Sequence, residues 1–185
     1  MSGLRLFQRK GAKGRPRINR VPSPALALGI PWASVMLASI APGWFLIASA
    51  PVLPPFGLLM LISWRQLRPG VLPIWAGLPL GMVDDLYSGQ PMGSAILLWS
   101  VACIVLDAVE ERLPWRNFAT EWLVASGLIS AYIVFSLALA NITGASTHLL
   151  VVVPQIVVSV LLFPLVGRIV AALDRTRLTP IVEIG

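Results

Sequence analysis

Long uncharged stretches separated by short polar connections dominate the chain. Residues 25–63 contain no charged side chain, and at about 20 residues per crossing they are long enough for two membrane helices with a turn near residues 49–51. Four further apolar runs follow, each bounded by polar or turn-forming residues: 71–87, 92–106, 122–140 and 149–173. The pattern therefore predicts an all-α fold, a polytopic membrane bundle of six transmembrane helices.

The polar segments divide the chain into three parts. Residues 1–24 are expected to form a flexible basic tail, because seven Lys and Arg alternate with Gly and Pro there. Residues 25–173 are expected to form the six-helix transmembrane domain. Residues 174–185 are expected to form a short C-terminal tail.

Two polar connections that carry basic residues interrupt the membrane domain. The first, residues 64–70, is expected to be a short basic turn at the membrane surface with Trp64 as an interface anchor. Its other marker residues are Arg65, Arg68 and Pro69. The second is expected to be a polar loop near Trp115, marked by Asp107, Glu110, Glu111, Arg112, Pro114 and Arg116.

The composition agrees with a membrane protein. Charged residues make up 12% of the chain, hydrophobic residues make up 57%, and the mean hydropathy is +0.83, whereas soluble domains contain about 25% charged residues. The net charge of +6 resembles that of nucleic-acid-binding proteins, but the basic tail has Phe7 as its only aromatic residue. We therefore expect attraction to anionic membrane lipids and no nucleic-acid partner.

The distribution of basic residues predicts the topology. All fourteen Lys and Arg fall in the N-terminal tail, in the connections after the second and fourth predicted helices, and near the C-terminus. The other three connections have none. Because basic residues mark cytoplasmic segments, both termini are predicted to lie in the cytoplasm. The acidic pair Asp84 and Asp85 then lies toward the extracytoplasmic side.

Residues 77–93 are the one place where carboxylates lie between two long apolar runs with no basic residue nearby. At about 100° per residue, the third predicted helix carries Gly77, Gly81, Asp84 and Asp85 on one face. Glycines four residues apart allow a neighbouring helix to come close. The carboxylates lie where the helix dipole disfavours anions, so they need compensation. Backbone N–H groups of the next helix or a cation from another chain would supply it.

The residues after the acidic pair predict how the chain passes into the next helix. Ser88 and Gly89 are typical of a helix end, and Pro91 is favoured in the first turn of a helix. This pattern supports a structural role for the carboxylates at the junction between two helices. Contact with a partner protein is the main alternative to that role.

Chemical roles for the acidic pair are weaker alternatives. Two carboxylates that share a proton occur in aspartyl proteases, but adjacent helical residues diverge by about 100° and cannot easily hold one water together. A proton or cation site is physically possible. His148, the only histidine, has no Cys, His or carboxylate at ligand spacing beside it. We therefore expect no catalytic residue, no cofactor and no metal site in this chain.

The order of these motifs resembles the MreD family of bacterial rod shape-determining membrane proteins. A basic turn with Trp and Pro is followed by a Gly-rich helix, then by Asp-Leu-x-Ser-Gly-x-Pro-x-Gly, then by an apolar helix. The matching residues are Trp64, Pro69, Gly81, Asp85, Leu86, Ser88, Gly89, Pro91 and Gly93. The chain departs from the family in three ways: it has Ser63 where the family usually has Tyr, Asp84 is an additional acid, and the basic tail is longer than expected.

The resemblance implies a non-enzymatic subunit of the elongation machinery in the bacterial inner membrane. It implies binding to MreC, and through MreC a coupling of MreB to the RodA glycosyltransferase and its penicillin-binding transpeptidase. The family fold is similar to the S-component of energy-coupling-factor vitamin transporters. Binding of a small molecule such as a vitamin is therefore the alternative function.

The resemblance also leads to a hypothesis for the binding surface. MreC is expected to dock on the face of Gly77 and Gly81 and on the turn from Gly89 to Gly93, with Asp85 fixing the junction. The full predicted motif is Gly77, Gly81, Asp84, Asp85, Ser88, Gly89, Pro91 and Gly93.

Overall fold

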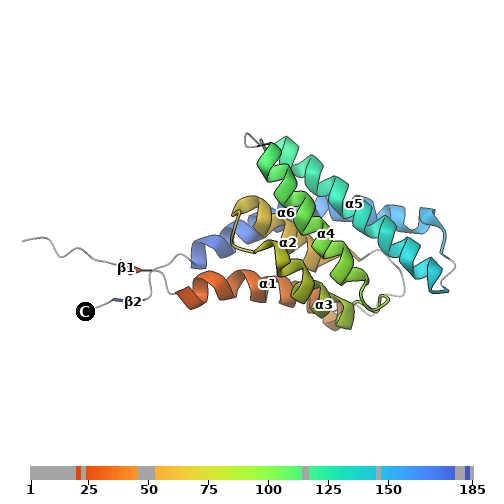
Figure 1. Ribbon diagram of the computed structural model, residues 1–185, viewed down its shortest axis with the longest axis horizontal. Coiled ribbons are helices and arrows are strands. Elements are labelled where there is room, and N and C mark those ends of the chain that lie inside the picture. The colour runs from red at the N-terminus through yellow and green to blue at the C-terminus, as the bar shows by residue number, and fades with distance from the viewer. Residues whose placement is uncertain are drawn as a thin grey trace, which may run out of the picture.

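The computed structural model describes residues 20–21, 24–45, 53–113, 117–144, 147–177 and 182–183, and this part of the chain is almost entirely helical (Figure 1). The all-α class and the six predicted helices are confirmed. The predicted turn at residues 49–51 and Trp115 lie outside the described residues. The helices are α1 (Pro24–Phe45), α2 (Phe56–Leu67), α3 (Gly77–Tyr87), α4 (Ser94–Arg112), α5 (Phe118–Ile142) and α6 (Val153–Arg177), with 3-10 turns η1 (Ile74–Ala76) and η2 (Leu149–Val152).

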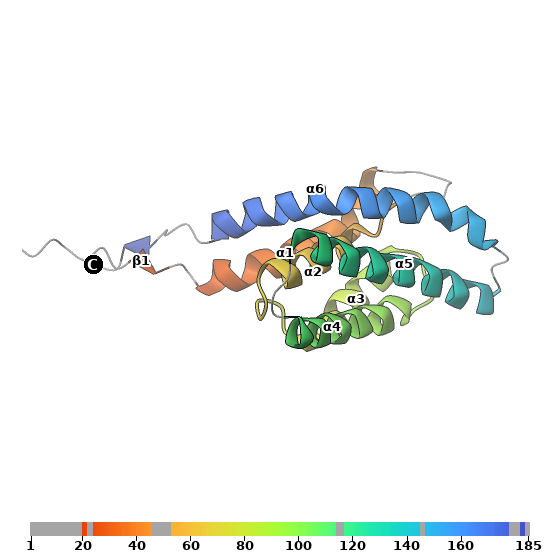
Figure 2. The same cartoon turned by 90° about the horizontal axis from the view of Figure 1, so that it is seen from above.

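Two short strands lie beyond one end of the helical bundle. β1 (Arg20–Val21) pairs antiparallel with β2 (Val182–Glu183), with Arg20 opposite Glu183. Both strands lie near the start of α1 and the end of α6 (Figure 2). The segments that enter and leave the bundle are therefore on the same side of it.

Three helical segments are long and apolar enough to cross a membrane by themselves: Leu26–Gly43, Phe118–Ile142 and Leu149–Arg177. By contrast, α2 and α3 have 12 and 11 residues. At 1.5 Å per residue they extend roughly 16–18 Å, against about 30 Å for the hydrocarbon core of a bilayer. The 19 residues of α4 end in a charged segment. Three of the six predicted spans thus have membrane length, and the other three are shorter or more polar than predicted.

The second helix, α2, forms the centre of the bundle. Every residue from Gly57 to Gln66 is buried, and Leu58, Leu61 and Ile62 have no exposed surface. The helix packs against α1, α4, α5 and α6. An apolar stretch of 10–14 residues is typical of a buried core helix. The uniform apolarity of this stretch therefore fits burial within the protein as well as the predicted crossing.

Two prolines determine how α6 contacts its neighbours. Pro31 lies inside α1 and Pro164 inside α6, and a proline has no N–H to donate to the carbonyl four residues earlier. The freed carbonyl of Ala27 accepts a hydrogen bond from Arg177 Nη1 at 2.9 Å. The freed carbonyl of Val160 accepts one from Trp122 Nε1 at 3.2 Å. Since backbone polar groups inside a membrane need partners, these bonds tie α1 to α6 and α6 to α5.

The end of α4 corrects the prediction of a polar loop. The helix continues through Arg112, so Asp107, Glu110 and Glu111 lie on its last turns and not in a loop. Leu113 then caps the helix, its backbone N–H donating to the Val109 carbonyl at 2.9 Å. Pro114 and Arg116 lie outside the described residues.

Replacing Trp122 with Phe should lower the thermal unfolding midpoint in detergent. The change keeps the aromatic ring but leaves the Val160 carbonyl without a donor, at a cost of roughly 1–3 kcal/mol. The control is Trp75→Phe, because Trp75 is 57% exposed and its ring nitrogen has no hydrogen bond among the described residues. Equal shifts for the two variants would contradict the role of the Trp122 bond.

Candidate functional site

The carboxylate of Asp85 caps the first turn of α4. The backbone N–H groups of Gly93 and Ile96 donate to Oδ2 at 2.9 and 3.2 Å. The N–H of Ala95 and the hydroxyl of Ser94 donate to Oδ1 at 2.8 and 3.2 Å. The sequence left two compensating partners open, the N–H groups of the next helix and a cation from another chain. Asp85 has the first of these. Carboxylates are stabilised there by these bonds and by the helix dipole.

The N-cap residue of α4 explains why the cap comes from another helix. That residue is Gly93, which adopts φ of 93° and has no side chain to accept the N–H groups. A carboxylate eight residues earlier supplies the missing acceptor. The geometry of the α3–α4 junction therefore depends on Asp85, whose side chain is 5% exposed.

The glycine face of α3 lies directly against the backbone of α4, and the two helices run side by side in both views (Figures 1 and 2). A Cβ at Gly77 would lie 2.7 Å from the Ser100 nitrogen, and a Cβ at Gly81 would lie 2.7 Å from the Ala95 oxygen. Real side chains do not approach backbone atoms so closely, so these positions require glycine. The face predicted to receive a helix of another protein is thus occupied by α4 of the same chain, which corrects that part of the prediction.

The turn between α3 and α4 remains at the surface. Ser88, Gly89 and Gly93 are exposed, and both glycines have positive φ, 67° and 93°, a conformation that side chains disfavour. Pro91 does not lie in the first turn of α4 as predicted. It precedes the helix, and its carbonyl accepts a hydrogen bond from the N–H of Ser94 at 3.0 Å.

The other carboxylate, Asp84, contacts a different part of the bundle. Its side chain is 7% exposed and accepts a hydrogen bond from the Tyr132 hydroxyl of α5 at 3.4 Å. The two adjacent carboxylates therefore have separate partners, in agreement with their divergence of about 100°. Asp84 lines a cavity of about 280 Å³ together with other polar side chains, among them Ser39, Gln90, Tyr132 and Gln155.

The predicted basic turn at residues 64–70 is for the most part the end of α2. Trp64 is fully buried, so its predicted role as an interface anchor is wrong, and its Nε1 donates to the Ser34 hydroxyl at 2.9 Å. Arg65 is only 4% exposed; it donates to the Leu72 carbonyl at 2.7 Å and pairs with Asp107 at 2.9 Å. Both side chains hold the bundle together from its centre.

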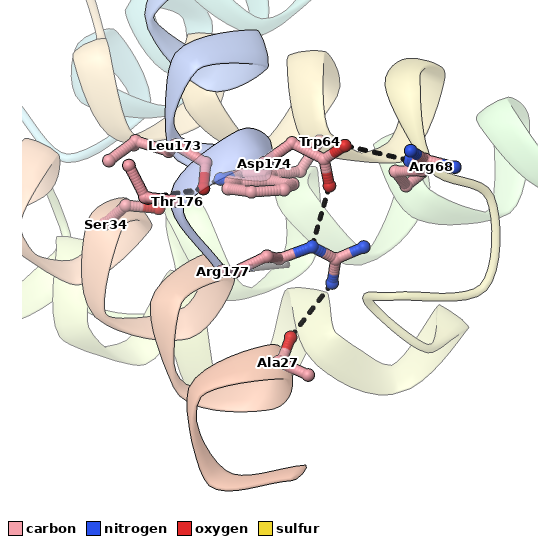
Figure 3. Close-up of polar contacts among 8 residues, drawn as sticks. All are labelled: Ala27, Ser34, Trp64, Arg68, Leu173, Asp174, Thr176 and Arg177. Carbon is pink, nitrogen blue, oxygen red and sulfur yellow. Dashed lines mark hydrogen bonds and ion pairs between the residues drawn. The ribbon is translucent and has the colours of Figure 1, made fainter. Parts of the chain in front are cut away.

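The turn itself begins at Arg68, which joins a second buried site at the end of α6 (Figure 3). Asp174 accepts hydrogen bonds from Arg177 Nε at 2.7 Å and from Arg68 Nε at 3.0 Å. Arg177 also binds the Ala27 carbonyl, and its Cζ lies 5.6 Å from the centre of the Trp64 ring. Charge-assisted bonds and a cation–π contact thus join α1, α2 and α6. Pro69 follows in an exposed turn.

Some residues of these sites were not predicted. Asp174 and Arg177 have opposite charges three residues apart, which is a sequence signal for a local pair on a helix. Pro31 offered a second signal, because its missing N–H frees a carbonyl for a distant donor. Nothing in the sequence distinguishes Tyr132 as a partner of Asp84. Among the residues that the structure describes, no three His, Cys, Asp or Glu are grouped to hold a metal ion.

Comparison with known proteins gives one match. The family model described as rod shape-determining protein MreD matches residues 25–172, which is most of the chain and includes all six helices for nearly their full length. No curated protein and no solved structure matches. The expected likeness to vitamin-transporter subunits therefore rests on the family resemblance alone.

Replacing Gly81 with Ala should destabilise the protein, because the new Cβ would collide with the backbone of α4. Overpacking of this kind costs about 1–3 kcal/mol, which lowers the thermal unfolding midpoint. Gly127→Ala on α5 is the matched control, since a Cβ there meets nothing within 4 Å. If the Gly81 variant unfolded at the same temperature as the control, the close contact between α3 and α4 would be refuted.

Replacing Asp174 with Asn should destabilise the end of the bundle at which α6 finishes. Arg177 would lose its counter-ion although its side chain is only 9% exposed, and removing one partner of a buried pair costs about 3–5 kcal/mol. The control is Glu111→Gln, an acid-to-amide change on the exposed end of α4. Thermal unfolding of the two variants in detergent gives the comparison, and a small, equal effect would contradict the proposed importance of Asp174.

Proposed function

Because this chain belongs to the MreD family of rod shape-determining membrane proteins, we propose that it is the inner-membrane subunit of the cell-elongation complex that captures MreC. Through MreC it helps to couple MreB filaments in the cytoplasm to peptidoglycan synthesis by RodA and its penicillin-binding transpeptidase. In this proposal the chain has a scaffolding role and no catalytic step of its own. Its effect is the maintenance of rod shape.

The observation that carries this proposal is an exposed turn held rigid from inside. Asp85 fixes the first turn of α4 through three backbone N–H groups, so residues 88–93 present a defined surface. Beside this turn, α3 exposes Leu78, Met82 and Leu86, with exposed fractions of 51%, 55% and 57%. Residues four apart lie on one face of a helix. An apolar stripe beside a rigid turn suits a partner with one membrane helix and an extracytoplasmic part, which is the form that the family resemblance gives MreC.

In the proposed topology the chain crosses the inner membrane six times and both termini lie in the cytoplasm. The basic residues lie in the N-terminal tail, in or beside alternate connections, and in the last part of α6 and its end near the C-terminus, which supports this topology. The pairing of β1 with β2 at one end of the bundle supports it too. Since α2 and α3 are shorter than a bilayer, the crossings there include adjoining non-helical backbone. Such backbone is tolerated where protein surrounds it.

Binding of a small molecule is a second candidate function, favoured by the cavity beside Asp84. A buried carboxylate, the Tyr132 hydroxyl and the Gln90 side chain line it, and they provide both acceptors and donors. Its volume of about 280 Å³ is just below the range of ligand sites, which is about 300–1,000 Å³. A vitamin would fill or exceed it, so capture of MreC is the function that we favour.

The test is depletion of this protein in its own bacterium, with the intact gene, Asp85→Ala and Asp84→Ala as rescues. Depleted rods should round into spheres, and the intact gene should restore them. Asp85→Ala should fail and should capture MreC on the order of tenfold less well, since loss of a helix cap costs about 0.5–2 kcal/mol and loosens the turn. Asp84→Ala leaves the cap intact and should rescue.

The outcomes separate the two functions. Unchanged cell shape after depletion, with a growth defect that a vitamin cures, would favour the small-molecule function, and failure of Asp84→Ala alone would point to the cavity. Equal capture of MreC by the intact protein and by Asp85→Ala, at equal levels in the membrane, would remove Asp85 from the proposed mechanism.

A further inference from the structure

A groove of about 280 Å³ opens between α2, α5 and α6, close to the end of α2 and the start of α5. Leu67, Phe118, Phe163 and Pro164 give it mainly apolar walls. None of its lining residues belongs to the α3–α4 junction or to the cavity beside Asp84. In a membrane protein an apolar groove on the outside of the bundle is accessible to acyl chains.

The groove is open because a side chain is missing from its floor. Gly167 lines it, and a Cβ at this position would meet no atom within 4 Å. Trp122, which also lines it, is held between α5 and α6 by its bond to the Val160 carbonyl that Pro164 leaves free. A side chain at position 167 therefore has open space at its Cβ, and a large one would extend into the groove.

Two opposite charges line the same groove without pairing. Neither Arg168 nor Glu121 has a side-chain hydrogen bond or an ion pair with any residue that the structure describes, although both border this space. Arg168 lies within the apolar segment Leu149–Arg177, about 13 Å along the helix from its end. A guanidinium group within an apolar segment is costly unless water or an anion reaches it.

We propose that the groove binds a phospholipid with an ethanolamine headgroup. The phosphodiester contacts Arg168, the ammonium group contacts Glu121, and an acyl chain lies along the apolar wall. A separated cation and carboxylate in one groove are complementary to a zwitterion.

Each charge also has an ordinary role. Glu121 lies in the first turn of α5, where an acid complements the helix dipole, and the long side chain of Arg168 can extend toward the membrane surface. Neither role explains why two opposite charges line one apolar groove without pairing. A zwitterionic headgroup explains both the presence of the two charges and their separation.

The test is native mass spectrometry of the delipidated full-length protein, titrated with phosphatidylethanolamine or phosphatidylglycerol of identical acyl chains. The intact protein should bind the ethanolamine lipid about tenfold more tightly. Gly167→Leu should weaken this binding by about tenfold, because leucine fills the groove. Gly127→Leu is the matched control on α5, since a Cβ there also meets nothing within 4 Å, and it should bind like the intact protein.

Two further variants assign the headgroup contacts. Arg168→Gln should weaken binding of both lipids, whereas Glu121→Gln should weaken only the ethanolamine lipid and so abolish the preference. The comparison of Gly167→Leu with Gly127→Leu tests lipid binding in the groove independently of these charges. Both variants should fold, because Leu is a better helix former than Gly. Equal binding of the two lipids by the intact protein, or equal binding by the two glycine variants, would mean non-specific lipid contact and would overturn the proposal.

Discussion

The contact on which the α3–α4 region depends is the carboxylate of Asp85 against the first turn of α4. α3 is too short to span a bilayer, and α4 begins at a glycine that cannot cap it, so neither helix fixes its own position at this end. Asp85 satisfies three N–H groups at once, while Gly77 and Gly81 let the two backbones touch. The exposed turn has a defined shape because these buried contacts hold both of its ends.

The rest of the bundle follows the same rule, that a polar group freed by local sequence must find a partner on another helix. Pro31 frees the Ala27 carbonyl for Arg177, and Pro164 frees the Val160 carbonyl for Trp122. Each proline thereby specifies which helix lies beside it. A membrane bundle lacks a strong hydrophobic force between its helices, so close packing and such bonds carry much of the specificity.

The sequence predicted the features that depend on local patterns. Hydrophobic runs located the six helices. The helix dipole indicated that the carboxylates needed compensation, and one of the two partners considered, the N–H groups of the next helix, is found at Asp85. What failed was the interpretation of residues 64–68: basic and aromatic residues at the end of an apolar run are typical of a membrane surface, yet Trp64 and Arg65 are buried. Their partners, Ser34 and Asp107, lie about 30 and 40 residues away along the chain. No local rule identifies such distant pairs.

These pieces give a consistent account of a shape-determining membrane protein. A central helix buried from Gly57 to Gln66 and paired charges at one end hold the helices together. We propose the α3–α4 turn, the groove beside Arg168 and the cavity beside Asp84 as sites of contact with other molecules. Membership of the MreD family indicates that the protein takes part in determining rod shape. The geometry is the basis on which we propose its contact surfaces.

The measurement that tests the central claim most directly is hydrogen–deuterium exchange at the backbone amides of Gly93, Ala95 and Ile96, in the intact protein and in Asp85→Ala. Capped amides should exchange slowly in the intact protein and on the order of tenfold faster in the variant, while amides in the middle of α4 keep their protection. Equal exchange at these three amides in both proteins would contradict the account, because the start of α4 would then be ordered without Asp85.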